Sequence, residues 1–295
     1  MNIVQVFFVL LLIGPIVWGI FNLKRYKGVS QPDVTVSFKT LINSGVLYAL
    51  AYNLIFFLQE LFLVLGKKAI GLEAYLYHNN HTWNGEHPMA SLMQGSGALA
   101  IFVLGLLFLL IYKWIKKSGS IWKLLVLWLA FHGLIQSLPQ VTVAYFDPGT
   151  DVGEALVGYL NLNSTLLIFL AILSVLAIAS VAVRFGGLLL GFAPQGIDLS
   201  NPKVRFKYVR FVAVGAALLG SVLIIPFRLP PLSQIIAPFF VLAISIPWMW
   251  SSVNVSGQIE RTSNTIDEKI HWMPIGLLFL LLVFFQLILA PGVKF

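Results

Sequence analysis

Three histidines of this chain lie within ten residues of one another, in the segment from His78 to His87. His78 and His81 have the spacing His-x-x-His, which places both rings on the same side of a helical turn. Neutral imidazole is the commonest protein ligand of zinc and also binds copper and iron. The segment therefore predicts metal ligation. The alternative that it leaves open is a solvated polar turn rich in Asn, Gly and His.

Glu60 and His132 are ionisable residues inside long apolar segments. Each lies five or six residues from the expected outer end of its segment, a depth of roughly 8 to 9 Å along a helix. Because a charged group in a membrane is costly, each needs a partner or water. Gln136 follows His132 at helical spacing and extends a polar stripe toward Gln140. We expect Glu60, His132 and Gln136 to form a catalytic pocket that opens outward; the alternative is a hydrogen bond joining two helices.

These residues suggest a zinc-like divalent metal bound by His78, His81, His132 and Glu60, with Glu60 as ligand or as general base. Secondary candidates for the site are His87, Glu86, Asp147, Asp151 and Glu154. The chain has no cysteine, which excludes disulfides, thiolate sites and iron–sulfur clusters. It also carries no haem or nucleotide signal.

The secondary candidates Asp147, Asp151 and Glu154 also have a simpler interpretation. Asp147-Pro148-Gly149 is a typical turn sequence. Thr150 or Asp151 would then accept hydrogen bonds from the free amides of the next helix, and Asp151 and Glu154 would place negative charge at its positive end.

The elements that must position these residues are apolar helices. The chain is 59% hydrophobic and 10% charged, and its apolar runs are long enough to cross a membrane. We predict an all-α polytopic transmembrane bundle, a single domain over residues 1–295, with eight spans at 3–21, 41–65, 92–112, 121–138, 157–183, 209–227, 233–250 and 272–290. The outer loops are then 66–91 and 139–156, and the cytoplasmic loops are 22–40, 113–120, 184–208 and 251–271.

The charge distribution predicts the orientation. If the spans alternate, 15 of the 19 basic residues fall on one side, which the positive-inside rule makes cytoplasmic. Both termini then lie on the outer (periplasmic) side of what we expect to be a bacterial inner membrane. The net charge of +8 is thereby explained without nucleic acid as a partner.

Small residues follow the histidine segment directly. Gly95, Gly97 and, further along, Gly105 allow a helix to approach its neighbours closely. Such a crossing would hold the histidine segment over the second and fourth spans. It would bring His78 and His81 toward Glu60 and His132.

Together these features favour a membrane-embedded, metal-dependent enzyme, a hydrolase or transferase acting on a lipid, peptide or lipid-linked substrate at the outer leaflet. One alternative is a proton-coupled transporter or channel in which Glu60 and His132 relay protons. Another is a non-catalytic subunit of an envelope complex, whose outer loops would contact other membrane subunits.

Overall fold

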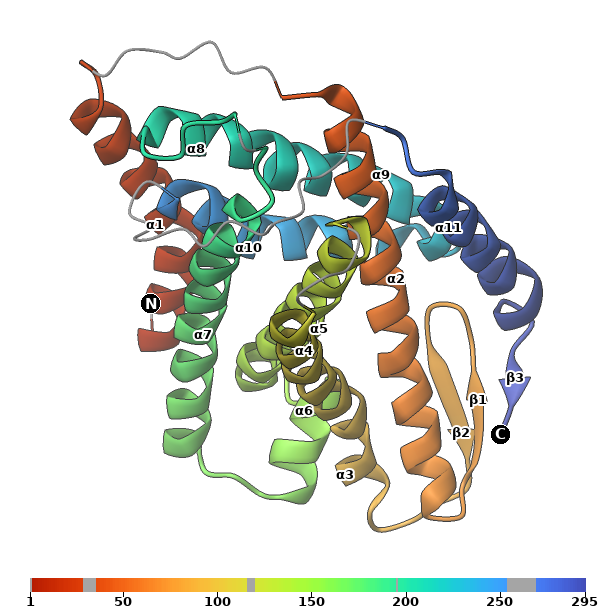
Figure 1. The fold of residues 1–295 in the computed structure, drawn as a ribbon. Coiled ribbons are helices and arrows are strands. Elements are labelled where there is room, and N and C mark those ends of the chain that lie inside the picture. The colour runs from red at the N-terminus through yellow and green to blue at the C-terminus, as the bar shows by residue number, and fades with distance from the viewer. Residues whose placement is uncertain (1, 29–35, 116–119, 195, 254–268) are drawn as a thin grey trace.

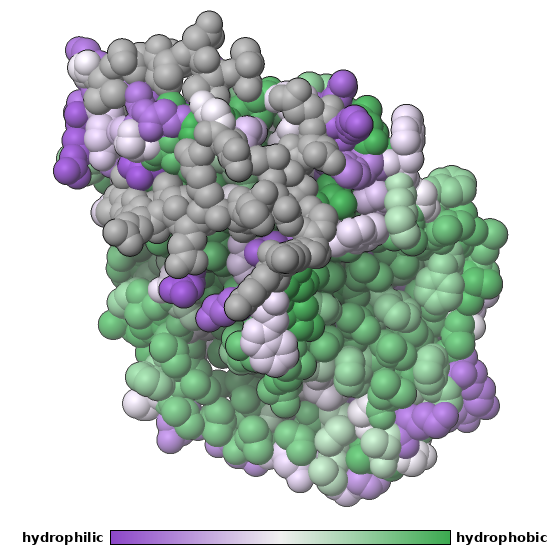
Figure 2. Space-filling model, in the orientation of Figure 1, coloured by the Kyte–Doolittle hydropathy of each residue, from purple (hydrophilic) through white to green (hydrophobic). Residues whose placement is uncertain are grey.

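The computed structural model describes residues 2–28, 36–115, 120–194, 196–253 and 269–295. Within these ranges eight helices are long and apolar enough to cross a membrane, which confirms the eight predicted spans and makes the chain an integral membrane protein. Their bounds are Ile3–Asn22, Phe38–Ala69, Ala90–Trp114, Ile121–Phe146, Ser164–Leu190, Pro202–Arg228, Leu232–Ser252 and Trp272–Leu289. Figure 2 shows the consequence on one face, where a broad apolar area separates a polar upper end from scattered polar residues along the lower edge.

The main helices are α1 (Ile3–Arg25), α2 (Phe38–Ala69), α4 (Ser96–Trp114), α5 (Ser120–Phe146), α7 (Ser164–Leu190), α8 (Pro202–Val209), α9 (Ala216–Arg228), α10 (Ile236–Ser252) and α11 (Trp272–Phe284). Short helices are α3 (Ala90–Gln94) and α6 (Asp151–Gly153). Single turns of π- or 3₁₀-helix are η1 (Glu154–Tyr159), η2 (Arg210–Gly215), η3 (Leu232–Ile235) and η4 (Phe285–Leu289).

Helices α2 and α5 form the centre of the bundle (Figure 1) and have the largest buried share of the eight spans. They carry the polar side chains Glu60, His132 and Gln136, which are unfavourable against lipid and therefore face protein. Helix α4 crosses both of them closely. A Cβ on Gly97 would lie 2.7 Å from the Gln59 carbonyl oxygen of α2, and one on Gly133 would lie 2.6 Å from the Gly105 Cα. The small residues therefore allow the predicted close crossing.

The predicted outer loop 66–91 contains a β-hairpin that the all-α expectation did not include. Strand β1 (Glu73–Leu76) pairs antiparallel with β2 (His81–Asn84), and the other edge of β1 pairs with β3 (Val293–Lys294) near the C-terminus. Ala74 and Leu76 are buried while Glu73 and Tyr75 are half-exposed, so the hairpin has the period of a strand. In Figure 1 the hairpin and β3 lie beside the lower part of α2.

The second predicted outer loop, 139–156, begins too early. Helix α5 contains Pro139 and continues to Phe146. A proline is tolerated inside a membrane helix where neighbouring groups satisfy the freed carbonyls. The fifth span starts at Ser164, where the Asn163 side chain accepts from the Leu166 amide, and not at residue 157.

The predicted cytoplasmic loops lie partly outside the described residues, which omit 29–35, 116–119 and 254–268. Loop 184–208 is shorter than predicted, because α7 runs to Leu190 and α8 starts at Pro202.

Candidate functional site

The most unusual polar group in the structure is Arg228, the last residue of α9. Its side chain is almost fully buried, with 2% of its surface exposed. One guanidinium nitrogen, Nη2, donates to the Tyr52 hydroxyl at 3.1 Å, and the group lies 3.5 Å from the centre of the Phe56 ring. Nε and Nη1 have no hydrogen-bond partner, and no carboxylate pairs with the guanidinium, among the residues that the structure describes.

The end of α9 is held in place by side chains from two other segments. A helix leaves its last carbonyl groups without intrahelical donors, and Pro230 and Pro231 have no amide hydrogens to supply. The Asn79 side-chain amide, at the tip of the hairpin, donates to the Arg228 carbonyl at 2.7 Å and to the Pro230 carbonyl at 2.8 Å. Gln286 of η4 donates to the Pro226 and Leu229 carbonyls. These hydrogen bonds therefore hold the backbone of Arg228 in place.

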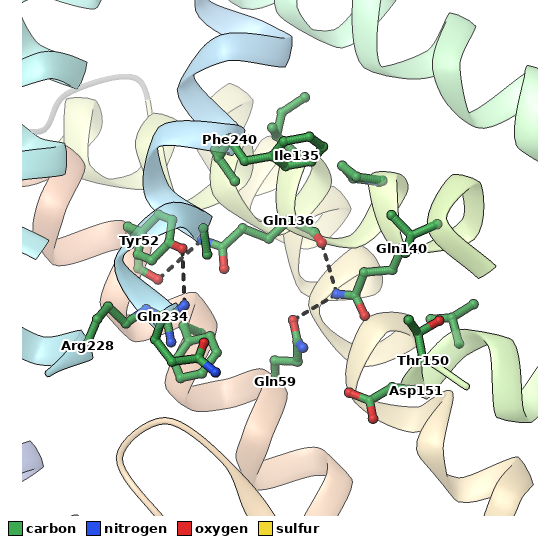
Figure 3. Close-up of a pocket in the computed structure, with 16 residues that line it drawn as sticks. Tyr52, Gln59, Ile135, Gln136, Gln140, Thr150, Asp151, Arg228, Gln234 and Phe240 are labelled. Carbon is green, nitrogen blue, oxygen red and sulfur yellow. Dashed lines mark hydrogen bonds between the residues drawn. The ribbon is translucent and has the colours of Figure 1, made fainter. Parts of the chain in front are cut away.

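Arg228 lines a pocket of about 490 Å³ formed by α2, α5, α6, α9, η3 and α10. Figure 3 shows the polar residues around it. Four glutamines contribute to the wall, Gln59, Gln136, Gln140 and Gln234. Ile135, Phe240 and Val241 form an apolar part of the wall. The pocket therefore combines a buried cation, neutral hydrogen-bonding groups and an apolar side.

A chain of hydrogen bonds orders three of the glutamines. Gln140 donates from Nε2 to the Gln59 side-chain oxygen and to the Gln136 carbonyl, both at 2.9 Å. Gln136 donates to the Tyr52 carbonyl at 3.3 Å. The polar stripe predicted on the fourth span thus reaches the pocket through Gln136 and Gln140 and joins it to α2.

Asp151 lies at the end of the pocket opposite Arg228 (Figure 3). Burial raises the pKa of this carboxyl group, and the charge of Glu60 raises it further, while His81 and Lys67 act in the opposite direction. The net effect is a raised pKa, so the group holds its proton to a higher pH than an exposed aspartate. Thr150, at the expected cap position, donates its hydroxyl to the Asp147 carbonyl, so the predicted cap through this side chain is wrong.

Glu60 is paired with His81. Its Oε2 lies 2.9 Å from His81 Nδ1, and His81 Nε2 lies 3.0 Å from the Gln94 side-chain oxygen. Burial alone lowers the pKa of His81, but the hydrogen bond and charge of Glu60 and the contact with Gln94 outweigh it, so the pKa is raised above 6.5. The His81 ring stacks with Trp83.

Trp83 connects this pair to a buried lysine. Lys67 is fully buried; its Nζ lies 3.7 Å from the centre of the Trp83 ring and donates to the Ala90 carbonyl. The charges of Asp151 and Glu154 both act on Lys67. Ionisable groups from α2, β2, α6 and η1 thus influence one another beside the pocket.

His132 does not join Glu60, which corrects the predicted pairing. Its ring packs between Tyr48, Tyr52 and Phe131, with centroids 4.4 to 5.3 Å away, and neither ring nitrogen has a hydrogen-bond partner within the described chain. Glu60 and His132 were expected at the same depth only because both helices were predicted to end too early. Helix α2 runs to Ala69 and α5 to Phe146, so His132 lies 14 residues from its end and Glu60 lies nine.

The remaining candidates are dispersed. His78 Nε2 lies 3.1 Å from the Pro230 carbonyl, and His87 accepts from the Met89 amide in a local turn. Glu86 is exposed, and Asp147 accepts from the Gly149 amide, as its turn predicts. Over residues 2–28, 36–115, 120–194, 196–253 and 269–295, no three His, Asp or Glu side chains gather as a metal would require. Of the predicted ligands only Glu60 and His81 meet.

Sequence reasoning missed Arg228, Tyr52 and Gln234 as pocket residues. One signal was available for Arg228. It is one of four basic residues predicted on the outer side, and only Leu229 separates it from a double proline at the end of an apolar segment.

Comparison of the chain with protein-family models, with curated proteins and with solved structures finds no match.

Proposed function

We propose that this membrane protein binds an anionic group, such as a phosphate or a carboxylate, in the Arg228 pocket. The observation that carries the proposal is the buried guanidinium with two nitrogens, Nε and Nη1, that no described residue pairs. A buried donor without a partner costs about 1 to 3 kcal/mol, and more when it is charged. A planar guanidinium binds phosphate or carboxylate through two parallel hydrogen bonds, which would remove this cost.

The pocket also supports chemistry on the bound group. Asp151 at the opposite end has a raised pKa because it is buried, so it keeps its proton to a higher pH than an exposed aspartate and is a candidate general acid. The glutamine amides supply neutral donors and acceptors for the rest of a substrate. These features favour a hydrolase or transferase that acts on an anionic, lipid-linked or peptide substrate at the hairpin side of the membrane. A metal-dependent reaction would need a ligand besides Glu60 and His81.

Proton-coupled transport is the second candidate. The observation that favours it is the network of Glu60, His81, Lys67 and Asp151, whose charges affect one another at one edge of the pocket. A proton bound by this network would change the field at the anion pocket. Transport differs from the enzyme proposal in leaving the bound anion chemically unchanged.

Anion binding can be tested with methyl phosphate and acetate, by calorimetry on the detergent-purified full chain. We expect Arg228→Gln to weaken binding of at least one of them about tenfold to a hundredfold, because a charge-assisted hydrogen bond contributes about 1.5 to 3 kcal/mol. The matched control is Lys68→Gln, which removes an exposed charge near the hairpin and should bind normally.

Ligand-free stability separates binding from structure. If the unpaired guanidinium is kept for a ligand, Arg228→Gln should have the same melting temperature as the wild type or a higher one. Failure of the wild type to bind either anion, or equal affinity in Arg228→Gln, would overturn the proposal.

A further inference from the structure

A second cavity, of about 200 Å³, lies beside the Arg228 pocket, between α1, α5, α7 and α10. The two cavities adjoin, because both are lined by Pro139, Val143 and Phe240. The second cavity alone is lined by Phe8, Val175, Ile178 and Ile244.

The second cavity is apolar. Its one hydroxyl-bearing side chain, Thr142, donates to the Ala171 carbonyl and lies 3.1 Å from Ser174 Oγ, so its hydroxyl is engaged within the α5–α7 contact. Apolar cavities stay dry and accept apolar ligands, because water needs two to four polar partners. Hydrocarbon therefore suits this space better than water does.

The depth of the cavity fits hydrocarbon as well. Val175 and Ile178 lie in the middle third of the 27-residue helix α7. Phe146 also lines the cavity and is 46% exposed, so one wall is at the surface of the bundle. A chain in this space would lie at the level of the surrounding lipid tails.

We propose that the ligand is an amphiphile whose anionic group binds Arg228 and whose hydrocarbon chain passes Val143 and Phe240 into the second cavity. This inference rests on the proposed anion binding. It narrows the class of ligand from anions in general to alkyl or acyl compounds with an anionic head. The head would bind in the Arg228 pocket and the hydrocarbon chain in the second cavity.

The test compares methyl phosphate with butyl and octyl phosphate on the purified full chain. Equilibrium dialysis fixes the free aqueous concentration, and empty micelles give the background. We expect affinity for the wild type to rise about threefold to fourfold for each methylene that enters the cavity. Val175→Phe fills the cavity, so it should bind methyl phosphate like the wild type but octyl phosphate at least tenfold more weakly.

Val183→Phe is the matched control, because it is the same substitution on the same helix at a residue that is 40% exposed. Its affinity should rise with the length of the alkyl chain as much as the affinity of the wild type does. If affinity rises equally with alkyl length in Val175→Phe and in the wild type, the alkyl chain does not enter this cavity. The inference then fails, while anion binding at Arg228 stands. If the wild type binds neither methyl phosphate nor acetate, the proposed function itself fails.

A second measurement covers the case in which Val175→Phe does not fold. An octyl phosphate with a terminal diazirine, activated by light on the wild type, should label the segments that contain Phe8, Val175 or Ile244. Excess methyl phosphate should prevent the labelling. Labelling confined to lipid-facing segments, or unaffected by the competitor, would overturn the inference.

Discussion

Arg228 and His81 are both buried basic side chains, but only His81 has a carboxylate as its partner. His81 is buried against a carboxylate, Glu60, which stabilises its protonated form. Arg228 is buried with a hydroxyl and an aromatic ring, which leave two of its nitrogens without a described partner. The histidine is therefore satisfied within the protein, whereas the arginine is suited to a group from outside it.

The His81–Glu60 pair predicts a definite pH dependence of stability. Because the folded-state pKa of His81 is raised above 6.5, the stability that the pair contributes is fully present below the unfolded pKa and is lost as pH rises through the folded one. The difference in melting temperature between the wild type and Glu60→Gln should therefore shrink as pH rises above about 6.5. His87→Gln, in a local turn, should show the wild-type profile. A difference that stays constant or grows with pH would contradict the pairing.

At the scale of elements, the hairpin fixes the helix end that carries Arg228. Asn79 at its tip binds two carbonyls of the α9–η3 connection, and β1 is itself held by β3 near the C-terminus. Three segments far apart in sequence therefore determine where the guanidinium lies. The pocket needs this support, because a binding group must be held rigidly to gain from its hydrogen bonds.

Asn79→Ala should reveal that support. It removes the Asn79 hydrogen bonds to the Arg228 and Pro230 carbonyls, so we expect a loss of about 1 to 3 kcal/mol in stability. Affinity for methyl phosphate should fall as well, although Asn79 does not line the pocket. Asn80→Ala, at the exposed neighbouring position, should change neither quantity. Lower stability with unchanged affinity would mean that the hairpin does not position Arg228.

At the scale of the molecule, the bundle is asymmetric in charge. The pocket lies on the hairpin side, where the sequence predicts six of the eleven carboxylates and only four of the 19 basic residues; the other 15 basic residues are predicted on the opposite side. The positive-inside rule predicts that the hairpin side is the outer one, which would place the pocket at the outer leaflet.

Cysteine labelling tests this orientation directly, because the chain has no native cysteine. In sealed cells, Asn84→Cys on the hairpin should react with an impermeant maleimide. Lys113→Cys at the end of α4 should react only after lysis; both positions are exposed. The reverse pattern would place the pocket on the cytoplasmic side.

The sequence by itself determined the eight spans, because the tendency to enter a membrane is nearly a sum over consecutive residues. It also predicted the close crossing at Gly97 and the polar stripe through Gln136 and Gln140, since both depend on residue type and helical spacing within one segment. The turn at Asp147 is local in the same way.

Only the tertiary structure decided the partners of the polar groups. Glu60 bonds His81 and not His132 because α2 and α5 extend beyond the predicted span ends, which changes their relative depth. The pocket exists because α2, α5, α6, α9, η3 and α10 come together around it. A side chain's partner depends on the rotation and axial position of separate helices, and these follow from the packing of the whole bundle rather than from any one segment.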